Sequence, residues 1–472
     1  MNLYALAQAM EASVFDEASC PWDFEISGVC TDSRRVRPGD VFFALRGEKF
    51  DGHDFLKAVT EAGAAALVVE TPEASLSIPQ LVVSDTTRAY GEGASAWARQ
   101  FPTCQTLAVV GSNGKTTTTQ LLGRLLKAEF GEDAVLVTEG NFNNSIGVAH
   151  MLWSLRPTHT HAVLEAGISH PGEMAELAPW IAPDGVLITN AQREHQAYLN
   201  SVEVTAYENG MMILALPPET GLVVYPFEDP GAGIWRSYSA VHGVRSLGYV
   251  CLTPEEPKPL ALIESDKVAG VLMDAPEGSM IQYAGAGHEF SWPFHLAGKH
   301  YAHDMVGAVT MALAVGVREG TVQKAMAEVC PLPGRGASFL CQDGALRVID
   351  EAYNANPDSM AAAMRALKTV WGARYPEASL TFVMGDMAEL GELSGPYHEE
   401  MGELAHELGL TLWTYGEMSR LAQAAYGHGG RHFTDREALA QAILALTGVV
   451  MIKSSHSTGL YQLVATLKAK AS

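Results

Sequence analysis

The chain is poor in cysteine and in positive charge. Its six cysteines, among 472 residues, stand at positions 20, 30, 104, 251, 330 and 341, and no two form a C-x-x-C pair. This excludes the disulfide frameworks of small secreted domains and the paired-cysteine zinc and redox motifs, so we expect reduced thiols. Lysine and arginine number 31 against 54 aspartates and glutamates, a net charge of -23. Because the basic residues never form a run of five or more, we expect no nucleic acid partner.

Two further features are missing. The first 33 residues contain no lysine or arginine, so the positively charged start of a signal peptide is not present. No uninterrupted apolar stretch approaches the roughly 20 residues that a membrane-spanning helix needs. The sequence therefore predicts a cytoplasmic protein without a membrane span.

The length and the balance of residue types indicate several globular domains. Hydrophobic residues make up 47% and charged residues 18% of the 472 positions, and domains of about 150 residues would give about three of them. We predict an α/β fold with a small N-terminal α/β domain (1–88), a central domain with a mostly parallel sheet (89–316) and a C-terminal, Rossmann-like doubly wound domain (317–472).

Short apolar runs alternate with helical patterns, which is typical of βαβ units and parallel sheets. Helices are expected over 55–62 and 117–129, and the Pro- and Gly-rich stretch 217–287 is expected to hold loops and short strands that extend a sheet. The predicted strands are 41–45, 64–69, 106–110, 135–137, 162–165, 186–189, 346–349, 380–384, 410–415 and 449–452.

A glycine-bearing turn stands between an expected strand and an expected helix. Its sequence is Gly111-Ser112-Asn113-Gly114-Lys115-Thr116. Small glycines let backbone N–H groups point at phosphate oxygens, a lysine reaches the β- and γ-phosphates, and a threonine hydroxyl can bind Mg²⁺. Only the inner G-x-x-G-K-T of the standard motif is present, because Val109 stands where the leading glycine would be. The turn predicts an ATP site.

Metal-binding side chains follow two later strands. Glu165 ends the run 162–165, and His195 comes shortly after the strand 186–189 and Asn190. In an open α/β sheet the carboxyl ends of parallel strands form the edge where ligands bind. We therefore expect Glu165 and His195 near the phosphate loop as metal donors.

Together these motifs resemble those of the Mur ligases over residues 28–457. The matching pieces are Thr31-Asp32-Ser33-Arg34, Pro38-Gly39-Asp40, Phe43-Ala44-Leu45, Asp51-Gly52-His53, the phosphate loop, Gly140-Asn141-Phe142-Asn143-Asn144, Glu165-Ala166-Gly167, Asn190 with His195, Pro333-Gly334-Arg335, Tyr353-Asn354-Ala355-Asn356-Pro357 and Gly385-Asp386-Met387-Ala388-Glu389-Leu390-Gly391. The Tyr-Asn-Ala-Asn-Pro motif favours the branch of the family that adds a dipeptide.

The resemblance implies an enzyme, an ATP-dependent ligase of peptidoglycan precursor synthesis. It would join D-alanyl-D-alanine to UDP-N-acetylmuramoyl-tripeptide through an acyl phosphate, forming ADP and phosphate, with ATP and Mg²⁺ bound and the chain a monomer. The N-terminal domain would bind the UDP-sugar and the C-terminal domain the dipeptide.

The site residues expected on this basis fall into four groups. Catalysis is expected from Lys115, His195 and Glu208; ATP binding from Gly111, Ser112, Asn113, Gly114, Lys115, Thr116, Thr117, Asn190, Arg335, Asp350 and Glu351; substrate binding from Ser33, Arg34, Asn141, Asn144, Tyr353, Asn354 and Asn356; and metal binding from Thr116, Glu165, His195 and Glu208.

The sequence departs from the family pattern at three places. Family members usually carry a CO₂-modified lysine a dozen or so residues after the histidine, whereas a gapless match places Asn209 or Glu208 there. We hypothesise that Glu208 supplies the carboxylate, because Mg²⁺ prefers oxygen donors. Asp304 stands where an asparagine is expected, and His456 where an arginine is expected.

Two other functions stay open. One is a different Mur-type ligase that adds an amino acid, and the other is a nucleotide-binding scaffold without turnover, which the departures at Asp304 and His456 motivate. A kinase or NTPase motor is not favoured, because we find no further Asp-bearing strand-end motif near the loop and no arginine finger.

Overall fold

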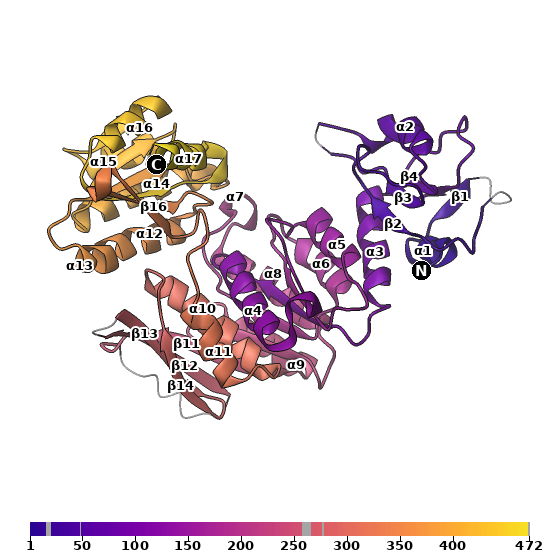
Figure 1. The fold of residues 1–472 in the computed structure, drawn as a ribbon, viewed down its shortest axis with the longest axis horizontal. Helices are drawn as coiled ribbons and strands as arrows, with labels where there is room; N and C mark the ends of the chain where they lie inside the picture. Colours follow the sequence, from indigo (N-terminus) through magenta and orange to yellow (C-terminus); the bar gives the residue numbers. More distant parts are fainter. Residues whose placement is uncertain (16–19, 48, 257–265, 276–277, 471–472) are drawn as a thin grey trace. The chain divides into compact units, whose positions relative to one another are not determined.

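The computed structural model describes residues 1–15, 20–47, 49–256, 266–275 and 278–470 (Figure 1). The described chain divides into two compact units. Unit 1 comprises residues 1–108, 133–166 and 175–183, and unit 2 comprises residues 109–132, 167–174 and 184–472.

Unit 1 contains a five-stranded sheet in the order β1-β5-β4-β3-β2. Strands β2 to β5 run parallel to their neighbours, and β1 is antiparallel to β5. Every residue of β3 and β4 is buried, as inner strands of a covered parallel sheet require. The elements are α1 (Leu3–Ala9), β1 (Ser13–Phe15), β2 (Gly28–Cys30), β3 (Asp40–Phe43), α2 (Leu56–Glu61), β4 (Ala66–Val69), β5 (Gln80–Val82) and α3 (Thr86–Ala98).

Unit 1 also holds β7 (Val135–Val137), α5 (Ser145–Trp153), β8 (His161–Glu165) and most of α6 (Glu173–Ile181), with the first residues of β6 (Gln105–Val110). The strand order here is β6-β8-β7, and β7 and β8 are parallel. Helices α3 and α5 pack together. Their contact contains the rings of Tyr90 and Trp153, whose centroids are 6.3 Å apart, and the indole of Trp153 donates to the Tyr90 carbonyl oxygen.

Unit 2 continues from the end of β6 with the strand order β14-β13-β12-β11-β10-β9-β6. Strands β9 to β12 are parallel, and β12, β13 and β14 form an antiparallel extension. Helices α10 and α11 pack against α4. The elements are α4 (Lys115–Phe130), β9 (Gly185–Ile188), α7 (Gln196–Leu199), α8 (Val202–Gly210), β10 (Leu222–Pro226), α9 (Ala232–His242), β11 (Arg245–Leu252), β12 (Lys267–Ala275), β13 (Gly278–Gly285), β14 (His288–Pro293), α10 (Lys299–Ala314) and α11 (Glu319–Ala327).

The last part of unit 2 is a six-stranded sheet in the order β15-β16-β20-β17-β18-β19, parallel except for β15. Buried apolar side chains form one core cluster with α12 and α14 and another with α16 and α17 (orange to yellow in Figure 1). The elements are β15 (Ala337–Cys341), β16 (Leu346–Glu351), α12 (Pro357–Ala366), α13 (Gly372–Arg374), β17 (Leu380–Gly385), α14 (Ser394–Glu407), β18 (Thr411–Tyr415), α15 (Ser419–Tyr426), β19 (Arg431–Phe433), α16 (Arg436–Leu444), β20 (Gly448–Lys453) and α17 (Leu460–Ala469).

The predicted α/β fold and the predicted strands are confirmed, with ends that differ by a few residues. The prediction for 217–287 is correct that this stretch extends a sheet and holds a short strand, β10, but it is wrong about the other elements. The helix α9 lies there, and β11, β12 and β13 are eight or nine residues long rather than short. Residues 257–265 and 276–277 of this stretch lie outside the described residues.

Candidate functional site

The turn between β6 and α4 has the backbone that a phosphate loop needs. Gly111 has φ +125° and Gly114 has φ +81°, values that favour glycine. A Cβ at Gly111 would lie 2.2 Å from Thr189 Oγ1, and a Cβ at Gly114 would lie 2.2 Å from Asp304 Oδ1. Glycine is therefore required at both positions for two reasons: the positive φ, and the lack of space for a Cβ.

Asparagine side chains hold this loop from one side. The backbone N–H of Asn113 donates to Asn190 Oδ1 at 2.9 Å, and Asn190 Nδ2 donates to the Asn113 carbonyl at 3.0 Å. Ser112 Oγ accepts from the backbone N–H of Gln192 at 2.9 Å. The segment that follows β9 thus fixes the loop, as expected for Asn190.

The ammonium group of Lys115 lies over the loop. It donates to the carbonyl oxygens of Gly111 at 2.5 Å and Ser112 at 3.0 Å, and it lies 3.3 Å from Glu194 Oε2. Glu194 is buried, and its Oε1 has no hydrogen-bond partner. Glu194 is not among the residues expected from the sequence, although its place beside His195 was a signal.

Arg335 reaches the start of α4 from the turn before β15. Its Nη2 donates to Thr116 Oγ1 at 2.9 Å, and its guanidinium lies 4.1 Å from the centre of the Tyr353 ring. Thr117, the next residue, is buried. Arg335 therefore lies at the phosphate loop, and Tyr353 supports the arginine.

Asp350 and Glu351 stand behind Arg335. Asp350 Oδ2 accepts the backbone N–H of Gly334 at 2.9 Å, which fixes the turn that carries the arginine. Glu351 Oε1 accepts from the Tyr301 hydroxyl at 2.7 Å, and its Oε2 lies 3.7 Å from Lys453 Nζ. Burial raises the pKa of Glu351. Neither carboxylate has a described hydrogen bond to the phosphate loop.

Asn356 links the start of α12 to the phosphate loop. It caps this helix in a capping box with Ser359. Its side chain also exchanges two hydrogen bonds with the side chain of Asn113, at 2.9 and 3.2 Å. Asn354, in the same motif, contributes its carbonyl oxygen, which accepts from Lys453 Nζ at 2.9 Å. Asn356, expected to bind substrate, is thus a contact of the phosphate loop.

His195 precedes α7 and has the uncommon left-handed φ of 45°. Its Nδ1 lies 2.7 Å from Glu389 Oε2, an ion-pair distance. Contact with His195 lowers the pKa of Glu389. Glu389 also has a positive φ, 62°. Backbone strain of this kind persists only where the surroundings enforce it, and often at functional sites.

Asn209, and not Glu208, contacts the phosphate loop. Asn209 is fully buried on α8, where its Oδ1 accepts the backbone N–H of Gly111 at 2.9 Å and its Nδ2 donates to the Thr205 carbonyl at 2.9 Å. Glu208 is half-buried, and its enclosed Oε2 has no hydrogen-bond partner. Burial, Tyr207 and Glu208 together raise the pKa of Tyr238 on α9.

Glu165 ends β8 in unit 1 and suits a hard cation. Its Oε1 accepts from Asn143 Nδ2 at 2.7 Å, and its backbone N–H donates to Thr138 Oγ1 at 2.9 Å. Its Oε2 is buried without a hydrogen-bond partner, and a carboxylate oxygen of this kind fits Mg²⁺. In the part of the chain that the structure describes, no three His, Cys, Asp or Glu side chains form a metal cluster by themselves.

Four expected substrate residues lie in unit 1. Arg34 is exposed and donates to both carboxylate oxygens of Asp32, at 2.9 and 2.8 Å, which lowers the pKa of Asp32 to about 2. Ser33 is part of the same turn. Asn144 caps α5 by accepting the backbone N–H of Gly147, and Asn141 is an exposed residue of the preceding loop.

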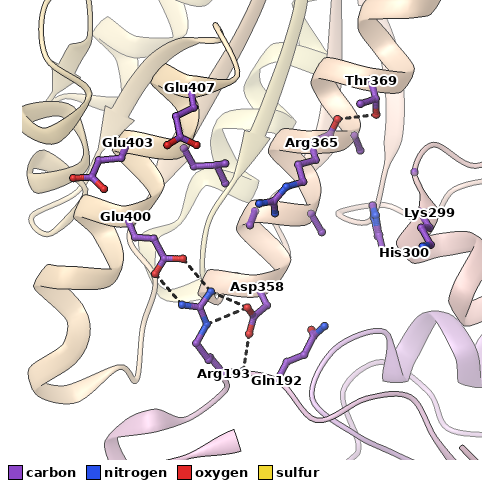
Figure 2. Close-up of a pocket in the computed structure, with 15 residues that line it drawn as sticks. Gln192, Arg193, Lys299, His300, Asp358, Arg365, Thr369, Glu400, Glu403 and Glu407 are labelled. Atoms are coloured by element: carbon purple, nitrogen blue, oxygen red, sulfur yellow. Dashed lines mark hydrogen bonds and ion pairs between the residues drawn. The ribbon is translucent and has the colours of Figure 1, made fainter. Parts of the chain in front are cut away.

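A cavity of about 680 Å³ lies in unit 2 beside Gln192 (Figure 2). Its volume suits a small molecule. The start of α10, α12 and α14 form its walls, which carry both positive and negative side chains. The charged residues of the lining are Arg193, Lys299, Asp358, Arg365, Glu400, Glu403 and Glu407.

Asp304 is buried on α10 against Gly114. Burial raises the pKa of its carboxyl well above the usual value, and Arg335 opposes this shift.

Among the described residues no helix combines the length and apolar character of a membrane crossing.

The fold and this site define a phosphate-loop α/β protein that also has a Rossmann-like C-terminal sheet. Three domain patterns match the chain: the Mur ligase family catalytic domain over residues 25–100, the Mur ligase middle domain over 109–312 and the Mur ligase glutamate ligase domain over 337–456. The chain belongs to the Mur ligase family.

Full-length relatives support the same assignment. The chain is 30% identical to the UDP-N-acetylmuramoyl-tripeptide–D-alanyl-D-alanine ligase of Escherichia coli K12, with 94% of each chain covered. It is 29% identical to the Haemophilus influenzae ligase of the same name, which covers 100% of this chain and 99% of that one. A crystal structure of MurF from Acinetobacter baumannii superposes with a TM-score of 0.86 at 27% identity, and 99% of each chain is covered.

Proposed function

We propose that this chain is an ATP-dependent ligase that joins D-alanyl-D-alanine to UDP-N-acetylmuramoyl-tripeptide in the cytoplasm. The observation that carries the proposal is the 30% identity, over 94% of both chains, to a ligase of that name. The phosphate loop supports it, because Gly111, Gly114 and Lys115 have the arrangement that binds a nucleoside triphosphate.

The reaction has two steps. A terminal carboxylate oxygen of the tripeptide forms a bond to the γ-phosphorus, the bond to the β,γ-bridging oxygen breaks, and ADP leaves. The dipeptide amine then attacks the acyl carbon, the acyl–phosphate bond breaks, and an amide, phosphate and one proton are released. In the first step two anions must approach each other, so positive groups are required at the γ-phosphate.

Lys115 and Arg335 are the cations that we assign to this task. Both lie at the loop, and Lys115 moves from the loop carbonyls to the phosphates when the triphosphate binds. Thr116 and Glu165 would hold Mg²⁺, which when bound supplies charge neutralisation at the phosphates. The support for Glu165 is its buried, unpartnered Oε2. We propose His195 and Glu208 as further metal-site residues, because Glu208 also has an enclosed unpartnered oxygen.

The remaining assignments follow the motifs. We propose that Ser33, Arg34, Asn141 and Asn144 bind the UDP-sugar peptide and that the region around Tyr353 and Asn354 binds the dipeptide. We propose Asp350 and Glu351 as ATP-binding residues, and the support for Asp350 is that it fixes the turn that carries Arg335. We also propose domain borders at 88/89 and 316/317 and a monomeric state.

The test is phosphate release by the purified chain with ATP, Mg²⁺ and UDP-N-acetylmuramoyl-tripeptide, with and without D-alanyl-D-alanine. Tripeptides that end in lysine and in diaminopimelate are both supplied, and the product is weighed by mass spectrometry. We expect dipeptide-dependent release and a UDP-linked pentapeptide, and we expect Lys115→Ala to abolish both. Release with a single amino acid in place of the dipeptide would indicate another Mur-type ligase. Nucleotide binding without release would indicate a scaffold.

A further inference from the structure

The segment 190–197, which runs from just after β9 into the start of α7, is bonded on two sides. On one side Asn190 and Gln192 hold Asn113 and Ser112 of the phosphate loop, as described above. On the other side the segment contacts the last part of unit 2. A residue that fixes this segment therefore acts on the side chains beside the phosphate loop without touching a nucleotide.

Arg193 makes most of the contacts on the second side. Its backbone N–H donates to Asp358 Oδ2 at 2.7 Å, and its Nε and Nη2 donate to Asp358 Oδ1 at 3.0 and 2.8 Å. Its Nη1 and Nη2 donate to the two carboxylate oxygens of Glu400 at 2.8 and 3.1 Å. The guanidinium also lies 4.9 Å from the centre of the Tyr397 ring. Figure 2 shows Arg193 between these two carboxylates.

These contacts differ from an ordinary surface ion pair in two respects. The side chains of Arg193, Asp358 and Glu400 are only 24%, 26% and 45% exposed, so their charges are partly shielded from water. The bond from the Arg193 backbone means that Asp358 holds the main chain as well as the side chain. Charge-assisted, two-pronged hydrogen bonds of this kind are stronger and more directional than single ones.

The two residues that follow Arg193 contact groups of the proposed active site. Glu194, the next residue, lies 3.3 Å from Lys115 Nζ. His195 follows it and contacts Glu389. A shift of the main chain at 193 would move both side chains, because one is directly bonded to it and the other is two residues away.

We propose that Arg193 is a positioning residue of the ligase. By binding Asp358 on α12 and Glu400 on α14, it fixes the segment 190–197 where Glu194 meets Lys115 and His195 meets Glu389. The proposal rests on the proposed function. It predicts that Arg193 governs the catalytic step more than nucleotide binding, because Asn190 and Gln192 continue to hold the phosphate loop when Arg193 is replaced.

The test compares Arg193→Met with Arg318→Met. Arg318 is a matched control, because it also joins two elements of unit 2, pairing at 2.6 Å with Glu129 of α4, and its partner is not at the phosphate loop. We expect Arg193→Met to lower kcat about tenfold or more and to change the Kd for ADP less than about threefold. Arg193→Lys keeps the positive charge but not the two-pronged guanidinium, so its kcat should lie between those of the wild type and Arg193→Met. Arg318→Met should keep the wild-type kcat.

Two further measurements separate positioning from a merely structural role. Asp358→Asn should lower kcat little further when it is added to Arg193→Met, because the two residues act as a unit. Amide hydrogen exchange should speed up within 190–197 in Arg193→Met and not in Arg318→Met. Equal kcat in Arg193→Met and Arg318→Met, with the wild type active, would overturn the proposal. A wild type that forms no pentapeptide would instead overturn the proposed function, and unchanged exchange in 190–197 would then overturn the positioning role independently.

Discussion

Alanine at Gly114 should be far more harmful than alanine at most glycines of this chain. Gly114 precedes α4 with φ +81° and ψ -6°, and its added methyl group would lie 2.2 Å from one oxygen of Asp304 and 2.6 Å from the other. Gly243, after α9, is the matched control. It has φ +72° and ψ 31°, and nothing lies within 4 Å of its added methyl group.

The two substitutions share one cost and differ in another. A left-handed backbone costs a residue with a Cβ about 1–2 kcal/mol. At Gly114 the buried carboxyl of Asp304 must also leave its rotamer, which adds about 0.5–1.5 kcal/mol. We therefore expect about 1–2 kcal/mol for Gly243→Ala and about 1.5–3.5 kcal/mol for Gly114→Ala, and only Gly114→Ala should weaken nucleotide binding.

The assay is urea unfolding followed by tryptophan fluorescence, together with the Kd for ADP of each folded variant. Asp304→Ala added to Gly114→Ala should recover the steric part of the loss, whereas Asp304→Ala should be additive with Gly243→Ala. Equal losses of stability for Gly114→Ala and Gly243→Ala, or additivity of Gly114→Ala with Asp304→Ala, would refute the close approach of Gly114 to Asp304.

Three further predictions concern single side chains. Burial raises the pKa of Asp229 from 3.8 to about 6, so between these pH values the folded chain holds a proton that the unfolded chain has lost. The stability contributed by Asp229 therefore falls as pH rises through this window, by up to about 3 kcal/mol. Asp229→Asn should gain stability relative to the wild type between pH 4 and 7 in urea titrations, and parallel pH profiles would contradict this. Glu389→Gln keeps the side-chain length but removes the negative partner of the site histidine, so kcat should fall about tenfold with little change in the Kd for ADP; an unchanged kcat would exclude that role. Asn356→Ala removes a helix cap, at about 1 kcal/mol, and the amide pair with Asn113, so it should lower both the Tm and the affinity for ADP. Asn144→Ala, which removes the cap of α5 but no bond to the phosphate loop, should lower the Tm without changing the affinity for ADP, and equal ADP affinities of the two variants would refute the link.

Local patterns in the sequence were enough for the α/β fold and for the phosphate loop. An inner strand such as β9 is a continuous apolar run, because both faces of the sheet are covered. The two glycines of the loop are set by backbone angles that few other residues adopt. Both signals lie within a few neighbouring positions and can be read without knowing what packs against them.

The prediction was weakest where a side chain chooses between partners distant in sequence. A gapless match left Glu208 and Asn209 both open, and burial on α8 brings Asn209 to Gly111. Arg193 had no motif of its own, because its partners Asp358 and Glu400 lie 165 and 207 positions away.

The sequence by itself determined which groups can bind phosphate and cations, because that chemistry belongs to the residue types and to their spacing within one turn. Only the tertiary structure decided which of them meet. Arg335 reaches Thr116 across 219 positions and Asn356 reaches Asn113 across 243. Such contacts depend on how whole sheets and helices pack, so the residues adjacent to these positions in the sequence do not indicate them.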